Sequence, residues 1–285
     1  MDKVTIIGMG LIGGSLGMAI KNKGLAGKVV GVSRNTEHLK EALAKEALDE
    51  YSIDPVEASK DADLIFICTP ISMIVPMIKT VYAVAKKGCI VTDVGSSKAG
   101  IVSEAESSVP EGVSFVGGHP MAGSERSGIK AATKYLLEGS NYILTKTDKT
   151  PAQALEKLGG FIQKLDAELT VISPAMHDLA VAAISHMPLA ISASLVNAVG
   201  GLGKEKELCL KLASSGFRDS TRIASGSVDM GKDMFVTNSG AVLEMIAAFK
   251  AALEKLEGLI KKGDAPGIAQ ELEKAKKLRD GVYGS

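Results

Sequence analysis

The segment Gly8-Met9-Gly10-Leu11-Ile12-Gly13 follows the strand-like run Val4-Thr5-Ile6-Ile7 directly and opens a helical pattern at Leu11. A Gly-x-Gly-x-x-Gly motif alone is weak evidence. Here it has a strand before it, a helix after it and a second strand about twenty residues on, which is the context of a dinucleotide-binding turn. In such a turn Gly8 permits the tight bend, Gly10 lets backbone N–H groups reach a pyrophosphate, and Gly13 allows the helix and strand to pack closely. The sequence therefore predicts a dinucleotide site at Gly8, Gly10, Leu11, Ile12 and Gly13.

The first half of the chain alternates short, β-branched runs with helical patterns. Five of the runs are almost continuously apolar, as strands buried on both faces of a parallel sheet are. The expected strands cover residues 4–7, 28–32, 64–68, 89–93, 114–116 and 142–144. The expected helices between them cover residues 11–22, 36–45, 71–85 and 98–108. Because parallel strands need crossover connections of this kind, the pattern predicts an α/β fold with a Rossmann-type, doubly wound parallel sheet.

The second half of the chain is mainly helical. After a helix start at Thr150-Pro151 and a last β-like stretch at 168–172, only helical periodicities follow. The expected long helices cover residues 173–199, 241–262 and 267–279. We therefore expect a dinucleotide-binding domain over residues 1–148 and an all-helical substrate and dimerisation domain over residues 149–285. Two long apolar helices with little sheet to cover indicate a homodimer.

Composition and charge argue against several classes of protein. Lysine plus arginine (33) balance aspartate plus glutamate (33), so the net charge gives no general reason to expect a nucleic acid or a membrane as partner. The uninterrupted apolar stretches are far shorter than the roughly 20 residues that span a bilayer, and the N-terminus has no signal-peptide pattern. Cys68, Cys89 and Cys209 are widely spaced and lie away from histidines. We expect a cytoplasmic protein with neither a disulfide framework nor a bound metal.

The end of the second expected strand bears on the choice of dinucleotide. NAD-binding turns normally carry Asp or Glu there, which accepts hydrogen bonds from the ribose 2′-hydroxyl. This chain has Ser33 and Arg34, which can donate hydrogen bonds to a phosphate and do not repel it. These residues favour NADP over NAD, unless Arg34 is only a solvated surface residue. Thr69, directly after the strand at 64–68, is a further expected cofactor contact.

His119 is the candidate general base. It lies in Gly117-Gly118-His119-Pro120, directly after the strand at 114–116. Ligands of open parallel sheets bind at the carboxyl ends of strands, and a histidine there can take a proton near neutral pH. The alternative is a loop histidine that only hydrogen-bonds backbone groups.

The other histidines are less clearly placed. His186 precedes Pro188, which should kink its helix, so the imidazole either faces a pocket or satisfies the freed carbonyl groups. We expect His177, in the first turn of the same helix, to be structural or exposed. His38 lies among charged residues and is expected to be exposed.

Two further polar segments carry candidate site residues. Ser96 follows the strand at 89–93, where it either caps the next helix or reaches the nicotinamide ring of a cofactor. Arg222 lies in Phe217-Arg218-Asp219-Ser220-Thr221-Arg222, where charges interrupt an apolar region. A carboxylate-binding arginine is one interpretation. The alternative is a structural pair of Arg222 with Asp219.

Residues 8–13, 93–98, 117–125, 185–188 and 217–224, in this order and spacing, resemble the prephenate/arogenate dehydrogenase family of tyrosine biosynthesis. The resemblance covers nearly the whole chain. It implies oxidative decarboxylation of a cyclohexadienyl carboxylate, with hydride transfer from C4 to NAD(P). By that resemblance His119 accepts the C4 hydroxyl proton, Ser96 hydrogen-bonds the same hydroxyl group, and Arg222 holds a substrate carboxylate. Glu125 and His186 correspond to residues that line the substrate pocket.

Two departures from the family pattern bear on the substrate. Prephenate-type members commonly carry a second histidine where this chain has Leu189, and a tryptophan where it has Gly231. Both differences resemble the arogenate-using, NADP-linked members, so arogenate is favoured over prephenate. Two alternatives stay open. One is another reductase with a Rossmann domain and a helical dimer, which would use a helical lysine or lack the histidine base. The other is a non-catalytic NADP-binding sensor.

Overall fold

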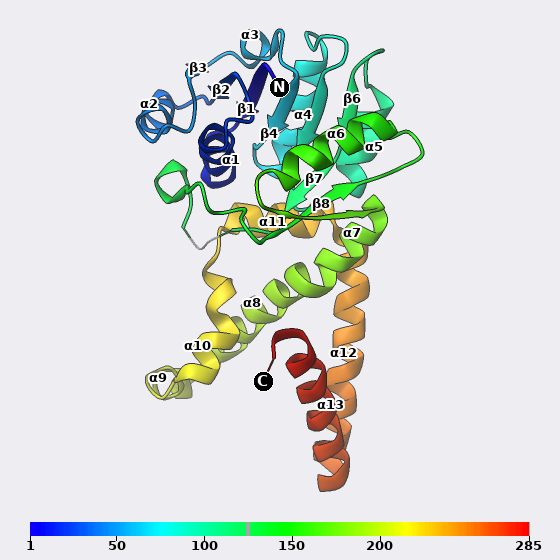
Figure 1. The fold of residues 1–285 in the computed structure, drawn as a ribbon. Helices are drawn as coiled ribbons and strands as arrows, with labels where there is room; N and C mark the ends of the chain where they lie inside the picture. Colours follow the sequence, from blue (N-terminus) through cyan, green and yellow to red (C-terminus); the bar gives the residue numbers. More distant parts are fainter. Residues whose placement is uncertain (124–125, 285) are drawn as a thin grey trace. The chain divides into compact units, whose positions relative to one another are not determined.

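A computed structural model describes residues 1–123 and 126–284. Its main feature is a six-stranded, all-parallel sheet in the order β3-β2-β1-β4-β5-β6 (Figure 1), which is the strand order of dinucleotide-binding folds. The strands are β1 (Lys3–Ile7), β2 (Lys28–Val32), β3 (Glu50–Ser52), β4 (Leu64–Ile67), β5 (Ile90–Asp93) and β6 (Ser114–Val116). The Rossmann-type sheet expected from the sequence is confirmed. The edge strand β3 was not expected, because it is short, polar and mostly exposed.

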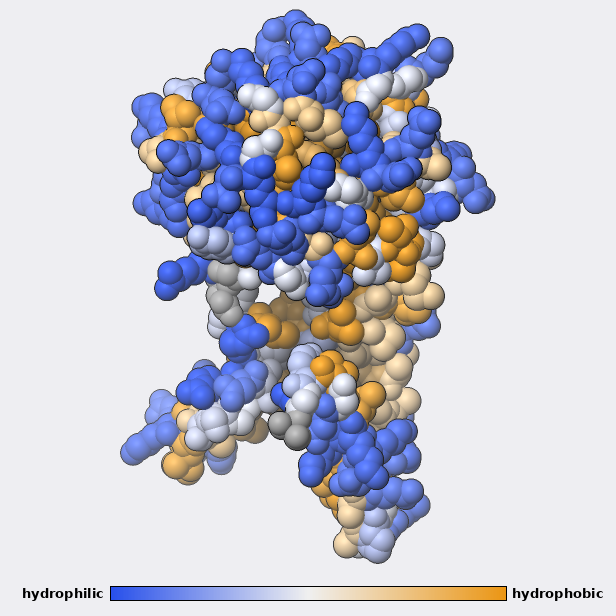
Figure 2. Space-filling model, in the orientation of Figure 1, coloured by the Kyte–Doolittle hydropathy of each residue, from blue (hydrophilic) through white to orange (hydrophobic). Residues whose placement is uncertain are grey.

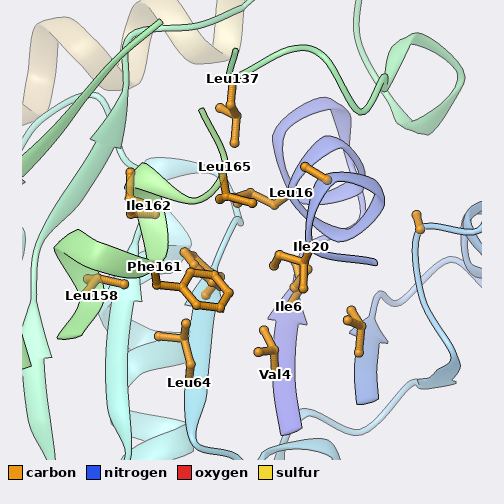
Figure 3. Close-up of a cluster of buried hydrophobic side chains, with 14 of the residues drawn as sticks. Val4, Ile6, Leu16, Ile20, Leu64, Leu137, Leu158, Phe161, Ile162 and Leu165 are labelled. Atoms are coloured by element: carbon orange, nitrogen blue, oxygen red, sulfur yellow. The ribbon is translucent and has the colours of Figure 1, made fainter. Parts of the chain in front are cut away.

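Helices cover both faces of this sheet. They are α1 (Leu11–Asn22), α2 (Thr36–Ala44), α3 (Pro55–Ser59), α4 (Ile71–Tyr82), α5 (Ala99–Ser107) and α6 (Ala152–Gln163). Alternate strand residues feed two separate cores. Leu64 and Phe66 pack with α1, α2 and α6, whereas Ile65 and Ile67 pack with α3, α4 and α5. Figure 3 shows the first core, in which the rings of Phe66 and Phe161 lie 6.2 Å apart.

A second sheet follows the first in the chain. It consists of β7 (Gly118–Pro120), β8 (Asn141–Thr145) and β9 (Glu168–Ile172), in the order β7-β8-β9. The sequence correctly predicts a strand at 142–144, but its expected place in the parallel sheet was wrong, because β8 pairs antiparallel with β7. The cause lies at Gly117-Gly118, where the chain leaves the parallel sheet immediately after the three residues of β6. The new strand β7 carries His119.

The N-terminal core extends beyond residue 148, the domain boundary expected from the sequence. Helix α6 follows that residue, and its Leu158, Phe161 and Ile162 are buried in the same core as β1 and α1. The strand β9 pairs in parallel with β8 along its whole length. The packing unit built on the dinucleotide-binding sheet therefore includes residues up to about 172.

The rest of the chain is helical, as expected. It consists of α7 (Pro174–Val181), a π-helical turn (Ala182–His186), α8 (Met187–Gly200), α9 (Lys206–Lys211), α10 (Ser215–Thr221), α11 (Val228–Thr237), α12 (Ser239–Lys262) and α13 (Ala265–Tyr283). By contacts, residues 1–239 and 240–285 form two compact units. In the second unit α12 and α13 are joined at Gly263, and Lys255 pairs with Glu271 at 2.6 Å.

The expected kink before Pro188 takes the form of the π-helical turn. Pro188 has no N–H to donate to a carbonyl one turn back, so the regular ladder is broken at this point. The chain accommodates the break with wider hydrogen-bonded turns over Ala182–His186. His186 ends the turn and is fully buried.

Taken with the π-helical turn, the continuous helical stretch Pro174–Gly200 is long and apolar enough to cross a membrane, the one such stretch among the described residues. The sequence indicated no such segment, because polar side chains divide it into short apolar runs. This criterion rests on length and composition alone, and core helices of globular proteins also meet it. Three of its polar residues, His177, Asp178 and His186, are buried and hydrogen-bonded to other residues of the chain.

Gly13→Ala is expected to destabilise the protein. A Cβ at Gly13 would lie 2.0 Å from the carbonyl oxygen of Gly8, so the backbone has to move. Overpacking of this kind costs about 1–3 kcal/mol in the free energy of unfolding. Gly100→Ala in α5 is the matched control, since a Cβ there meets no atom within 4 Å. Urea unfolding measures both, and equal midpoints for the two variants would contradict the packing argument.

Candidate active site

The glycine-rich turn leaves the N-terminus of α1 open to a ligand. Gly8 has a φ of +106°, and a Cβ there would lie 2.4 Å from the carbonyl oxygen of Cys68, so only glycine fits. At Gly10, in contrast, a Cβ would meet nothing within 4 Å. The first N–H groups of α1 have no partner within the helix and favour an anion. Beside the turn, the Thr69 hydroxyl oxygen is buried without a hydrogen-bond partner among the described residues. This cradle fits a dinucleotide pyrophosphate.

The end of β2 carries no carboxylate at the position where NAD-binding folds normally place one. Ser33 is half-buried, and its Oγ accepts a hydrogen bond of 3.2 Å from the backbone N–H of Asn35. Arg34 is exposed. Asn35 caps α2 by accepting hydrogen bonds from the N–H groups of Glu37 and His38. The nearest carboxylate on α2, that of Glu37, pairs with Lys40 at 2.9 Å.

A buried ion pair organises the loop after β5. Asp93 and Lys98 pair through Oδ2 and Nζ, and both side chains are fully buried. Burial lowers the pKa of Lys98, although the carboxylates of Asp93 and Asp178 oppose the shift. Asp93 also accepts hydrogen bonds from the N–H of Gly95 at 2.8 Å and of Gly118 at 3.2 Å. It therefore ties this loop to the strand that carries His119.

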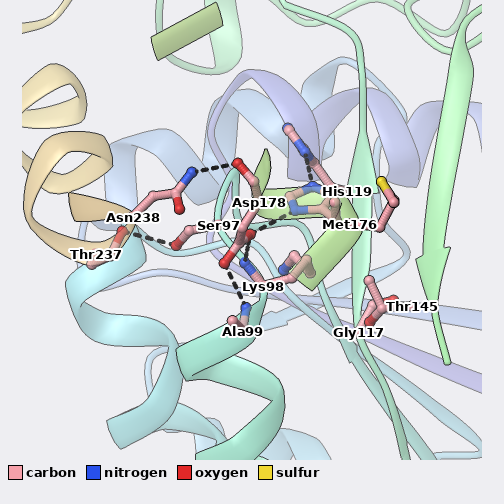
Figure 4. A network of polar contacts seen from close by, with 12 residues as sticks. Ser97, Lys98, Ala99, Gly117, His119, Thr145, Met176, Asp178, Thr237 and Asn238 are labelled. Atoms are coloured by element: carbon pink, nitrogen blue, oxygen red, sulfur yellow. Dashed lines mark hydrogen bonds and ion pairs between the residues drawn. The ribbon is translucent and has the colours of Figure 1, made fainter. Parts of the chain in front are cut away.

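Asp178 of α7 supplies the cap of helix α5. Its carboxylate accepts hydrogen bonds from the N–H groups of Lys98 at 2.6 Å and Ala99 at 2.8 Å (Figure 4). Burial alone would raise its pKa, but these bonds and the one from His177 hold the pKa of Asp178 below its ordinary value. Ser96 is thus not the cap of α5, which was one of its two expected roles. Ser96 is half-buried in the loop between β5 and α5.

His119 is half-buried in β7 and touches a second histidine. Its Nδ1 lies 2.8 Å from Nε2 of His177, and the two rings meet edge to face. Burial first, then the neighbouring His177, Lys98 and His186, lower the pKa of His119 well below its ordinary value of 6.5. A neutral imidazole near pH 7 is what a general base requires. The expectation for His177, structural or exposed, missed its contact with His119, because its side chain is fully buried against the candidate base.

His186 is also buried within hydrogen-bond distance of a described side chain. Its Nδ1 lies 3.2 Å from the Asn238 amide nitrogen, which also donates to the Asp178 carbonyl oxygen at 2.8 Å. Burial lowers the pKa of His186 to about 4, with His177 adding to the shift and Asp178 opposing it. Its Nε2 has no partner among the described residues. The sequence left open whether His186 faces a pocket or satisfies the freed carbonyl groups, and the polar partner observed for its Nδ1 is a side-chain amide.

A pocket of about 330 Å³ lies between the π-helical turn, α8 and the segment that contains Arg222. Its lining consists of Gly123, Ile184, Ser185, Pro188, Leu189, Arg222, Ile223, Gly226, Ser227, Met230 and Met234. The exposed guanidinium of Arg222 is therefore at a pocket wall, and Asp219 lies 3.2 Å from Nε of Arg218. Glu125, the other expected pocket residue, lies outside the described residues. A wider hollow of about 610 Å³ beside α6 contains none of the candidate residues.

Sequence reasoning missed four members of this site: Asp93, Lys98, His177 and Asp178. The segment 93–98 had been singled out, but only Ser96 in it was given a role. An aspartate at the end of an otherwise apolar strand was the available signal, because a buried carboxylate requires a partner. No comparable signal exists for His177 and Asp178, since their role depends on a contact about sixty to eighty residues away in the sequence. Among the described residues no group of three or more His, Cys, Asp or Glu side chains could hold a metal ion.

Comparison with known proteins shows the family. Residues 16–171 match the family model of the prephenate dehydrogenase nucleotide-binding domain, and residues 173–274 match that of the prephenate dehydrogenase dimerization domain. The chain is 33% identical over 282 residues to prephenate dehydrogenase of Bacillus subtilis, covering 99% of this chain and 76% of that protein. It is 29% identical over 278 residues to cyclohexadienyl dehydrogenase of Zymomonas mobilis, covering 97% and 94%.

Solved structures agree with these matches. Synechocystis arogenate dehydrogenase superposes with a TM-score of 0.86 at 34% identity, covering 98% of this chain and 99% of that one. Prephenate dehydrogenase from A. aeolicus, solved with hydroxyphenyl propionate and NAD+, superposes with a TM-score of 0.93 at 29% identity, covering 99% and 98%.

The sheet, the glycine turn and the histidine at the strand end define a pyridine-nucleotide-dependent oxidoreductase with a helical second part. Within that class, the chain belongs to the prephenate dehydrogenase family of tyrosine biosynthesis, whose reaction is an oxidative decarboxylation. The family resemblance stated from the sequence is confirmed.

The buried histidines should make the protein sensitive to acid. A histidine with a lower pKa in the folded than in the unfolded state binds fewer protons when folded, so the free energy of unfolding falls as the pH drops below 6.5. For His186 the fall ends near pH 4 and amounts to at most about 3 to 4 kcal/mol, at 1.36 kcal/mol per pKa unit. His186→Asn, which keeps an acceptor for Asn238, should reduce the difference in stability between pH 7 and pH 4.5.

Urea unfolding at the two pH values measures this difference. His38→Asn, at an exposed position, is the control and should keep the wild-type slope. An identical loss of stability in the wild-type protein and in His186→Asn would show that His186 does not carry the effect.

Proposed function

We propose that this protein oxidises and decarboxylates arogenate to tyrosine with NADP as hydride acceptor. The observation that carries the proposal is the placement of His119. It follows the carboxyl end of β6, is linked to the buried His177, and belongs to a segment that continues to Gly123 in the wall of the Arg222 pocket. Prephenate and NAD are the alternative substrate and cofactor.

The chemistry follows from the substrate class. The dinucleotide, when bound, supplies the hydride acceptor. His119 takes the proton of the C4 hydroxyl group as the C4–H bond breaks, so C4 becomes a carbonyl carbon. The bond from C1 to its carboxylate then breaks, CO2 leaves, and the bond electrons pass through the ring to the C4 oxygen. That oxygen takes a proton back, and the product is a phenol. The gain of an aromatic ring drives the second step.

The other proposed contacts follow the same geometry. Ser96 lies in the loop after β5, which Asp93 connects to the strand that carries His119. We assign to Ser96 a hydrogen bond to the C4 hydroxyl group and a contact with the nicotinamide end of the cofactor. Arg222, at the pocket wall, is assigned to a substrate carboxylate, because its planar guanidinium donates two parallel hydrogen bonds. Gly8, Gly10, Leu11, Ile12, Gly13 and Thr69 are assigned to the dinucleotide.

Two coupled positions support arogenate. Leu189 lines the pocket, and a Cβ on Gly231 would lie 3.2 Å from its Cδ2. The two departures from the prephenate-type pattern are therefore neighbours, so a side chain at 231 would contact Leu189. An apolar leucine neither donates to a keto acid nor repels the ammonium group of arogenate. The similarity to Synechocystis arogenate dehydrogenase is in line with this choice.

We also propose that the protein is a homodimer and that it is cytoplasmic, and the exposed apolar side chains of its helices support the association. Large hydrophobic side chains are exposed along the C-terminal helices, where Figure 2 shows hydrophobic colour at the surface. Examples are Leu202, Leu208, Leu210, Leu212, Leu243, Leu253, Ile260 and Leu278. Exposed large apolar side chains that gather on a helix are typical of an association surface. The helical part also matches a family model described as a dimerization domain.

Purified protein assayed with arogenate or prephenate, each with NADP or NAD, tests the proposed function. The highest kcat/KM is expected for arogenate with NADP, followed by the absorbance of the reduced nicotinamide. His119→Asn should lower kcat by about 10²–10⁴, the usual contribution of a general base, with little change in cofactor affinity. Cofactor binding without turnover of either substrate would instead identify a non-catalytic sensor.

The cofactor preference should reverse in the double variant Ser33→Asp, Arg34→Gln. The new carboxylate would repel the 2′-phosphate and accept hydrogen bonds from the ribose hydroxyls of NAD. Loss of charge-assisted hydrogen bonds of about 1.5–3 kcal/mol corresponds to a drop of about 10- to 150-fold in kcat/KM for NADP. Lys40→Gln, which removes an exposed cation of α2, is the control. An unchanged ratio of NADP to NAD activity in the double variant would refute the assignment of Ser33 and Arg34.

A further inference from the structure

A chain of hydrogen bonds runs from a carboxylate of the helical part to the candidate base. Oδ1 of Asp178 lies 2.8 Å from Nδ1 of His177, and Nε2 of His177 lies 2.8 Å from Nδ1 of His119 (Figure 4). We propose that Asp178 and His177 are positioning residues that hold the proton of His119 on Nδ1 and leave its Nε2 free to take the substrate proton. The inference rests on the proposed role of His119 as the general base.

The acceptor at one end of this series of hydrogen bonds fixes the position of each proton. The ionised Asp178 carboxylate can only accept hydrogen bonds, so Nδ1 of His177 carries a hydrogen. In a neutral His177, Nε2 then holds a lone pair and accepts. His119 is the donor to that lone pair, through Nδ1–H. Its other nitrogen, Nε2, keeps the lone pair that a base needs.

The competing arrangement gives the opposite result. If His177 carried protons on both nitrogens, its Nε2–H would donate to Nδ1 of His119, and the single proton of His119 would be on Nε2. Such a residue could not accept a substrate proton there. The charged and titratable groups that act on His119 are His177, Lys98 and His186. The Asp178 carboxylate favours that second proton on His177, and the buried Lys98 ammonium opposes it. Because Asp178 already accepts hydrogen bonds from the N–H groups of Lys98 and Ala99, the arrangement with one proton on His177 is the one that the proposal adopts.

Several hydrogen bonds hold Asp178, the first residue of this series, in place. Asp178 is held by two N–H groups of α5, and its own carbonyl oxygen accepts from Asn238. At the other end, the backbone of Gly118, next to His119, is bound to the Asp93 carboxylate. The imidazole of His119 is therefore oriented by its own strand and by a partner from α7. When it takes a proton, the Asp178 carboxylate stabilises the imidazolium through His177.

The proton position can be measured without any substrate. ¹⁵N NMR of the full-length protein, with the His119 signals assigned from His119→Asn, reports which ring nitrogen carries the proton. We expect the proton of the neutral His119 on Nδ1 in the wild-type protein. In His177→Leu we expect a shift toward the Nε2–H form, the commoner form of free histidine. A wild-type His119 with its proton on Nε2 would overturn the proposal, even if the Leu variant failed to fold.

Kinetics provide the second readout. His177→Leu should lower kcat at least tenfold, within the ~10²–10⁴ that a general base supplies, and leave the KM for the dinucleotide unchanged. The loss should be the same at every pH at which His119 is neutral, because tautomers carry the same charge. His177→Gln can present an acceptor oxygen near the position of Nε2, so it should recover most of the activity.

A control variant, and two different negative results, separate this proposal from the proposed function. His38→Leu removes an exposed imidazole and should match the wild-type protein in both measurements. If the wild-type protein turns over neither substrate, the proposed function fails, while the NMR result still decides the proton position. If the wild-type protein is active and His177→Leu keeps full kcat and the Nδ1–H form, His177 is not a positioning residue.

Discussion

One buried carboxylate, that of Asp178, connects the two kinds of structure in this protein. Asp178 lies close to the start of α7, and its carboxylate accepts hydrogen bonds from the first N–H groups of α5. It therefore acts as the helix cap that the β5–α5 loop does not supply itself. The same carboxylate accepts the hydrogen bond of His177, and through it reaches His119. A carboxylate is suited to this role because it accepts several hydrogen bonds at once, and together these bonds outweigh the effect of burial and hold the pKa of Asp178 below its ordinary value. Helix α7 is thereby linked by hydrogen bonds to the candidate base of the dinucleotide-binding part.

A buried ion pair, Asp93 with Lys98, also holds the backbone near His119 in place. Asp93 and Lys98 are both fully buried, and burial of such a pair is costly unless every polar group is satisfied. Asp93 meets that condition with the N–H groups of Gly95 and Gly118. The pair therefore contributes less to stability than to geometry, because it holds the β5–α5 loop and β7 in one arrangement. His119 is linked to both carboxylates, to Asp93 through the backbone of the neighbouring Gly118 and to Asp178 through the side chain of His177.

The sequence was informative where a function depends on local spacing. The glycine turn at 8–13 follows from residues within one strand, one turn and one helix, and in the structure a Cβ on Gly10 would meet nothing within 4 Å. His119 could be found because it follows a predicted strand at the edge where ligands bind. His177 and Asp178 could not, since nothing in their own neighbourhood distinguishes a buried relay from a solvated first turn. The second sheet was missed for a similar reason, because β8 looks the same whether it extends the parallel sheet or pairs with β7.

By itself, the sequence determined the fold class and the family, and it pointed to the glycine turn and to His119 as the candidate base, because each depends on a short motif whose backbone conformation is set by its own residues. Only the tertiary structure decided which side chains surround that base, where the core of the first part ends, and that the break before Pro188 becomes a π-helical turn that buries His186. Those features depend on contacts between segments separated by many tens of residues. Such contacts form because buried polar groups require hydrogen-bond partners, and these partners come from distant segments that a local sequence pattern does not identify.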